Sequence, residues 1–254
     1  MTRFLLLILL LAICACKEQA QESKQVTKQE AIVTAPIEKY DAIPMDSKIA
    51  SKLSKKEIAS IFTRRKQNLL GISNALYQAY SYKDESGEYY LLLTDHRKAI
   101  HEEKDTLYDN IYALNITNKN NQLKKRSTVT GEIDDDWETS IGFWNQYSEI
   151  SDLDGDGLVD LILVYGTTGQ NMYKDGRVKI LVYHNKKRVS IKHQNSDIDG
   201  GRHTKINKKL YALPLKIQDA VKEKMKLMSK NGHAIFSKGW EKEMANKATR
   251  LAEK

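Results

Sequence analysis

The sequence predicts an α+β protein with a mainly antiparallel β-sheet body followed by C-terminal helices. Two patterns carry this prediction. Segments of alternating apolar and polar residues, joined by short polar loops, fill much of residues 75–193, and this alternation is typical of half-buried strands. After Pro214 the apolar residues recur every three or four positions, which is the period of a helix. With 41% hydrophobic residues, the chain of 254 can build a sizeable core.

The first sixteen residues have the pattern of an export signal. Arg3 gives a positive start, residues 4–13 are an unbroken apolar run, and Ala15 places a small residue before Cys16. The run is shorter than the about 20 residues of a transmembrane helix. Segment 13–16, Ile-Cys-Ala-Cys, resembles the lipobox of bacterial lipoproteins, which implies cleavage before Cys16 and its lipidation, palmitate included. The alternative is an ordinary secretory signal that leaves a free thiol.

This resemblance implies a location as well as an anchor. Residues 1–15 are expected to be a signal peptide, and the membrane is an expected partner through the lipid. Because Lys17 and Glu18 follow the cysteine and no Asp does, lipoprotein sorting implies the outer membrane more than the inner, with the body in the periplasm or at the cell surface. Residues 16–45, rich in Gln, Glu, Lys and Thr, are expected to be a flexible tether. Residues 46–254 are expected to be one β-rich domain with C-terminal helices.

Within the body, the elements are predicted in chain order from their periods. A short helix is expected from Asp46 to Phe62. Antiparallel strands follow, with hairpins wherever a polar loop joins two of them. A segment that is apolar throughout, 161–165, indicates a central strand covered on both faces. The predicted strands are 75–82, 89–94, 108–116, 123–129, 140–150, 161–165, 177–184 and 189–193.

Two helices are predicted at the end of the chain from apolar stripes with lysines between them. The first starts at Pro214, whose missing N–H has no helical partner at that position anyway. Methionines at such spacing are far more often core contacts than ligands. The two stripes are Ile217, Val221, Met225 and Met228, and then Trp240, Met244, Ala248 and Leu251.

Residues 152–160, named here the acidic loop, carry the clearest chemistry. Their sequence, Asp-Leu-Asp-Gly-Asp-Gly-Leu-Val-Asp, alternates carboxylates with residues that permit a sharp turn. Ca²⁺ prefers several hard oxygen ligands, so a structural Ca²⁺ ion is expected here. Leu163 stands where an EF-hand has its glutamate, and the loop resembles instead the DxDxDGxxD loops of integrin-type β-rich domains. A metal-free acidic turn is the alternative. The expected ligands are Asp152, Asp154, Asp156, the backbone carbonyl of Leu158, and Asp160.

The net charge of +8 resides in the last quarter of the chain, from Lys186 onward, where basic residues far outnumber acidic ones. A basic surface there is expected to meet anionic polysaccharide or an acidic envelope protein. The alternative is the solvated face of amphipathic helices. Nucleic acid is not an expected partner of an exported protein.

Catalytic patterns are weak, and no catalytic residue is assigned. Both cysteines lie in the first sixteen residues, so the body has no Cys nucleophile or Cys-bound zinc. Residues 91–94, the acidic loop and Tyr-Ala-Leu-Pro at 211–214 together resemble bacterial surface-polysaccharide-biosynthesis lipoproteins, over roughly residues 70–240. That resemblance implies an envelope role linked to surface polysaccharide. We therefore expect a non-enzymatic binding or support protein, with an envelope hydrolase acting on glycans as the alternative.

Overall fold

The computed structural model describes residues 41–100, 106–120, 122–134 and 136–253. All of them belong to one compact unit, Thr34–Lys254. The predicted signal peptide, the lipidation site Cys16 and most of the tether lie outside the described residues. Within the described residues, no helix is both long enough and apolar enough to span a membrane.

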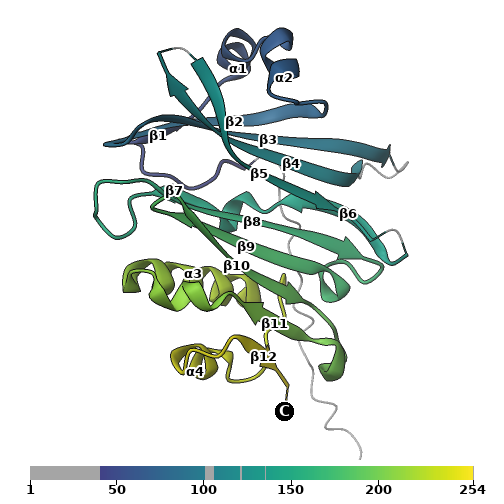
Figure 1. The fold of residues 1–254 in the computed structure, drawn as a ribbon. Helices are drawn as coiled ribbons and strands as arrows, with labels where there is room; N and C mark the ends of the chain where they lie inside the picture. The colour runs from purple at the N-terminus through teal and green to yellow at the C-terminus, as the bar shows by residue number, and fades with distance from the viewer. Residues whose placement is uncertain (1–40, 101–105, 121, 135, 254) are drawn as a thin grey trace, which may run out of the picture. The chain divides into compact units, whose positions relative to one another are not determined.

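Two antiparallel sheets form the body (Figure 1). The first consists of β1 (Ala50–Lys52), β2 (Ala75–Asp84), β3 (Gly87–Ile100), β4 (Thr106–Lys119) and β5 (Gln122–Glu132), paired in chain order. The second has the order β12-β11-β10-β9-β8-β6, with β7 also paired to β8. Its strands are β6 (Glu138–Phe143), β7 (Glu149–Ser151), β8 (Asp160–Gly169), β9 (Arg177–His184), β10 (Lys187–Gln194), β11 (His203–Ile206) and β12 (Arg250–Ala252). The predicted fold class is thereby confirmed.

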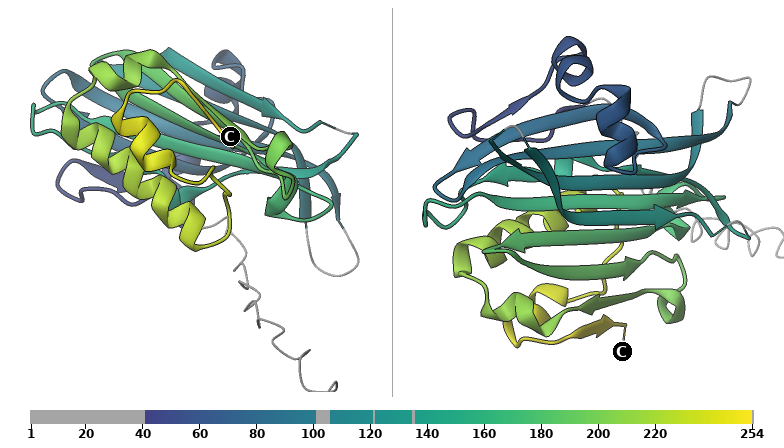
Figure 2. Two further views of the ribbon diagram at one scale, coloured as in Figure 1. Left: turned by 90° about the horizontal axis from the view of Figure 1, so that it is seen from below. Right: turned by 45° about the horizontal axis from the view of Figure 1, so that its top comes forward.

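The helices lie at the two ends of this arrangement (Figure 1). In the right view of Figure 2, α3 and α4 lie behind the seven-stranded sheet, whose other face is turned toward the viewer. The α-helices are α1 (Lys55–Ile61), α2 (Arg64–Leu69), α3 (Leu215–Lys230) and α4 (Trp240–Ala245). Short 3₁₀ turns are η1 (Asn145–Tyr147), η2 (Tyr173–Asp175), η3 (Asp199–Gly201) and η4 (Lys208–Ala212).

Three buried clusters hold these layers together. One packs α3, through side chains such as Met225, against the seven-stranded sheet. Another draws members from both sheets, among them Leu91 and Leu163, and therefore lies between them. The last packs Phe62, at the end of α1, against Leu92 on the opposite face of β3. Burial of these apolar side chains is the main driving force for the fold.

The central strand β8 behaves as its sequence predicts. Leu161 and Leu163 belong to the cluster between the sheets, whereas Ile162 and Val164 belong to the cluster beneath α3. Successive side chains of a strand point to opposite faces, so a strand covered on both sides needs apolar residues at every position. The predicted stripe of α3, Ile217, Val221, Met225 and Met228, is likewise fully buried.

The predicted helix from Asp46 is wrong at its start. Residues 50–52 form β1 instead, pairing with β2 so that Ala50 lies opposite Tyr82. The helix begins only after Ser54, whose hydroxyl accepts the N–H of Glu57 while the Glu57 carboxylate accepts the N–H of Ser54. This capping box fixes the start of α1 at Lys55.

The predicted last helix is also too long. It ends at Ala245, and Lys247 takes a positive φ of 58° that turns the chain away from the helix. Leu251 then lies on β12, opposite Thr204 of β11.

The predicted strand 140–150 is broken in the same way, since η1 interrupts it and leaves β6 and β7 on either side. In both cases tertiary pairing overrides the local period.

Candidate functional sites

The acidic loop joins β7 to β8, and its own backbone winds around Asp152. One oxygen of that carboxylate accepts the N–H groups of Gly155 at 2.8 Å and Asp156 at 3.1 Å, and the other accepts that of Gly157 at 3.0 Å. Both glycines have positive φ, 86° and 80°. Only glycine takes that conformation easily, so the loop's Gly positions are required by its winding.

This winding brings the predicted ligands together. Oxygens of Asp152, Asp154 and Asp156 lie within 4.8 Å of one another. The N–H of Leu158, the predicted carbonyl ligand, donates to Asp156 at 2.9 Å. Three carboxylates so close repel one another unless a cation lies between them. The geometry thus matches a hard, oxygen-ligated cation.

Asp160, the last predicted ligand, lies deeper than the others and has a histidine partner that the sequence did not reveal. Its side chain is only 1% exposed. One oxygen lies 2.8 Å from Nδ1 of His184 on β9, and the other accepts the N–H of Leu153 at 3.0 Å. Burial raises the pKa of Asp160 to about 6, although the hydrogen bond to His184 opposes this shift. Ligand atoms of Asp154, Asp160 and His184 also lie within 4.8 Å of one another.

The acidic loop is fastened to three other parts of the fold. The N–H of Val159 donates to Asp84 at the end of β2, at 3.0 Å. Lys216 on α3 donates to the backbone carbonyl of Asp154 at 3.1 Å. The side-chain amide of Asn185, in the turn after β9, donates to the Asp156 carboxylate at 3.2 Å. The loop therefore connects both sheets and a helix, and a bound ion would stiffen that junction.

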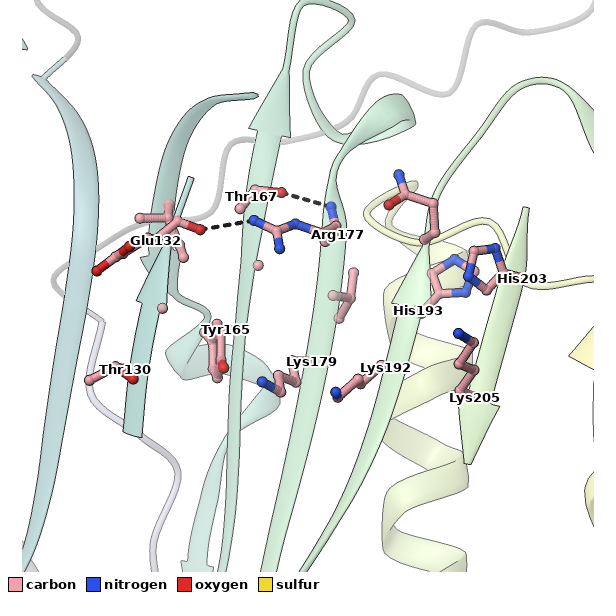
Figure 3. Close-up of a pocket in the computed structure, with 15 residues that line it drawn as sticks. Thr130, Glu132, Tyr165, Thr167, Arg177, Lys179, Lys192, His193, His203 and Lys205 are labelled. Atoms are coloured by element: carbon pink, nitrogen blue, oxygen red, sulfur yellow. Dashed lines mark hydrogen bonds between the residues drawn. The ribbon is translucent and has the colours of Figure 1, made fainter. Parts of the chain in front are cut away.

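A second site, which the sequence did not predict, is a cavity of about 350 Å³ on the face of the seven-stranded sheet away from α3 (Figure 3). Its walls come from β5, β6, β8, β9, β10 and β11, and its charged side chains are mostly cationic. The charged and histidine residues that line it are Glu132, Arg177, Lys179, Lys192, His193, His203 and Lys205.

Three of these cations, Lys179, Lys192 and Lys205, are named here the lysine ladder. Lys192 on β10 lies directly opposite Lys179 on β9 and opposite Lys205 on β11. Arg250 on β12 continues the row, because it lies opposite Lys205. At the other end, Tyr165 on β8 lies opposite Lys179, with the lysine nitrogen 5.5 Å from the ring centroid. Figure 3 shows the tyrosine and the three lysines in line on neighbouring strands.

The lysine ladder has no ion-pair partner in the described part of the chain. Among the described residues, neither its lysines nor Arg250 form an ion pair with a carboxylate. Like charges placed directly opposite each other across a sheet are destabilising. Burial lowers the pKa of Lys179, and the nearby charges of Arg188 and Arg177 lower it further. The row is therefore a concentration of positive charge that has no ion-pair partner among the described residues.

Arg177, at the upper edge of the cavity, differs from the ladder lysines because it has a carboxylate partner. Its guanidinium forms an ion pair with Glu138, whose side chain is completely buried. The guanidinium also donates to the backbone carbonyl of Glu132 at 2.8 Å, and the backbone N–H of Arg177 donates to the hydroxyl of Thr167 at 2.7 Å (Figure 3). The pKa of Arg177 is raised by the hydrogen bond to Glu138. Arg177 thus serves the structure, whereas the ladder beside it is available to a ligand.

No family model, curated protein or solved structure matches this chain. The two sites therefore have to be interpreted from their own geometry.

Sequence reasoning found the carboxylates of the acidic loop but missed His184 and the ladder. The basic bias after Lys186 was assigned to helices, whereas the ladder lies on strands and begins earlier, at Lys179. The sequence contained one signal for the register of β9 and β10. The pair Asn185 and Lys186 between two predicted strands fits a two-residue hairpin turn, and in the structure both residues have the positive φ of such a turn, 46° and 63°. A turn centred between them places Lys179 opposite Lys192.

Proposed function

We propose that this protein is a lipid-anchored component of the bacterial envelope whose body binds an anionic envelope component without transforming it. The observation that carries this proposal is the uncompensated row of Lys179, Lys192 and Lys205 along a cavity on an exposed sheet face. A cation row in a cavity with low-dielectric walls attracts and orients anions. The anchor at Cys16, and with it the outer-membrane location, rests on the sequence pattern alone.

The acidic loop has a separate role in this proposal, which is to hold a structural Ca²⁺ ion. Asp152, Asp154 and Asp156 offer converging oxygens, and the carbonyl of Leu158 and Asp160 complete the proposed ligand set. Because Asp160 already shares a hydrogen bond with His184, and nitrogen is not a ligand that Ca²⁺ favours, the ion is expected nearer the other three carboxylates. Bound there, it would stabilise the junction of the two sheets and α3.

Hydrolysis of a glycan is less well supported by the cavity. Most glycosidases need two carboxyl groups, one on each side of the scissile bond, with one able to donate a proton. Among the described residues that line the cavity, Glu132 is the only carboxylate. The nearby Glu138 is fully buried and is held by Arg177 and by the hydroxyl of Thr167 at 2.5 Å, so its carboxylate is committed to internal partners. This arrangement favours binding over catalysis.

The binding function is tested by retention of the purified full chain on dextran sulfate beads and on neutral dextran beads. We expect retention on the anionic beads only. The triple substitution Lys179→Gln, Lys192→Gln and Lys205→Gln should elute at clearly lower salt. A matched control, Lys208→Gln, Lys230→Gln and Lys242→Gln, removes the same charge from other exposed positions and should elute nearly like the wild type. Equal elution of both triple variants would refute the proposed site.

A further inference from the structure

The lysine ladder and Arg250 together form a regular row of cations, and the geometry of this row restricts which ligands can bind it. Lys179, Lys192, Lys205 and Arg250 occupy one register on four adjacent strands, β9 to β12. Neighbouring strands lie about 4.8 Å apart, and residues directly opposite each other point to the same face. The four charges therefore form a straight, evenly spaced row that runs perpendicular to the strands.

A compact anion does not match this row. One phosphate group or one lipid headgroup can reach two neighbouring cations and leaves the rest uncompensated. An extended acidic peptide also fits poorly, because its same-face side chains repeat every about 6.6 Å, compared with about 4.8 Å between strands. Successive sugars of an extended, unbranched glycan advance by a distance close to the strand separation. A glycan with one carboxylate per sugar therefore carries its charges at an axial spacing close to that of the strands.

The inner end of the row also suits a sugar. Tyr165 on β8 lies beside Lys179, and Thr130 on β5 lies farther along the same cavity, beyond Tyr165 (Figure 3). Both carry hydroxyl groups, which can donate hydrogen bonds to sugar oxygens or accept them from sugar hydroxyls. Toward β12 the row has no such wall, and Lys192, Lys205 and Arg250 are exposed. A chain can therefore begin at Tyr165 and continue past the edge of the sheet.

We infer that the lysine ladder and Arg250 bind an unbranched, carboxylated glycan that lies across β9 to β12, with one acidic sugar over each strand. The inference rests on the proposed function, which it narrows from any anion to a linear polyuronate-like chain. Charge complementarity and the spacing of the four cations carry it.

Oligogalacturonates of one to six sugars, titrated calorimetrically into the full chain, provide the test. Affinity should rise at least about tenfold from the single sugar to the tetramer and then level off, because only four cations are in line. Lys192→Gln, which interrupts the row at its centre, should lower tetramer affinity about tenfold. Lys192→Arg should retain it, and Lys230→Gln on α3 should not change it. Thermal melting of each variant shows whether it is folded.

The outcomes separate this inference from the proposed function. Affinity that does not depend on chain length, or inorganic phosphate binding as tightly as the tetramer, would overturn the inference while leaving an anion site. Poly-glutamate binding as tightly as an oligogalacturonate of equal charge would overturn the glycan assignment in the same way. If neither oligogalacturonate nor dextran sulfate binds at all, the proposed function itself fails.

Discussion

Like charges lie close together in both the acidic loop and the lysine ladder, but the two regions differ in the partners that these charges have. In the loop, backbone N–H groups and His184 compensate the carboxylates, which converge on one point. In the ladder, the cations form a line, and within the described part of the chain they have no carboxylate partner. Converging, internally bonded charges suit a structural ion. A line of uncompensated charges suits a long external ligand.

The largest effect is expected from pH, at a residue next to the ladder. His193 follows Lys192 on β10 but points to the other face, where it is 4% exposed. Its nitrogens bond to Thr204 at 2.8 Å and Asn195 at 2.7 Å, and burial lowers its pKa to about 4. Between about pH 6.5 and 4 the unfolded chain binds more protons, so the free energy of unfolding falls by up to about 1.4 kcal/mol per pH unit.

Urea denaturation between pH 7.5 and 4 measures this effect. His193→Gln cannot protonate, so its free energy of unfolding should decline less steeply below pH 6.5 than that of the wild type. The comparison is between slopes, since the substitution also changes the absolute stability. Identical slopes would mean that the buried histidine does not control the acid response.

Asp160 in the acidic loop should change the free energy of unfolding with pH in the direction opposite to His193. The pKa of Asp160 is raised to about 6 from an ordinary value of 3.8, mainly by burial. Between these values the folded state binds more protons, so this group makes the protein more stable as the pH falls through 6. Asp160→Asn removes that gain, and its stability should therefore drop more steeply than the wild type over the same urea series. A shallower drop would contradict the assigned direction.

The effect of Ca²⁺ is expected to be of intermediate size. With a dissociation constant of about 10⁻⁴–10⁻³ M, usual for extracellular sites, 10 mM Ca²⁺ should stabilise the fold by about 1.4–2.7 kcal/mol. EGTA should abolish the gain, and so should Asp154→Asn, which removes a carboxylate shared by both clusters of the loop. Lys192→Gln should keep it. Equal melting temperatures in Ca²⁺ and EGTA would argue against a metal in the loop.

The smallest effect is a gain in stability from disrupting the ladder. Lys192 lies opposite two other lysines, and relief of such repulsion is worth about 0.2–1 kcal/mol per pair. Lys192→Gln should therefore raise the melting temperature by a few degrees at low salt, and the rise should shrink at high salt. A lower melting temperature for this variant would show that the lysine stabilises the sheet.

Local patterns were sufficient to predict much of the fold. The hairpin at 75–94 follows from alternation, the strand at 161–165 from an unbroken apolar run, and α3 from its apolar stripe. The carboxylates of the acidic loop could be grouped because they are close in sequence. The pairing of Asp160 with His184 and the row from Lys179 to Arg250 depend on which strands are neighbours and in what register. A shift of one residue changes the face of every side chain, so a turn one residue longer than Asn185 and Lys186 would not place Lys179 opposite Lys192.

The most direct test of the two roles is one binding measurement on three forms of the full chain: wild type, the triple ladder variant and Asp154→Asn. Each is titrated with the oligogalacturonate tetramer at pH 7.5 and low salt, with melting curves to verify folding. The account predicts that the ladder variant loses most of its affinity while Asp154→Asn, once folded, binds like the wild type. Loss of binding in Asp154→Asn with full binding in the ladder variant would contradict it.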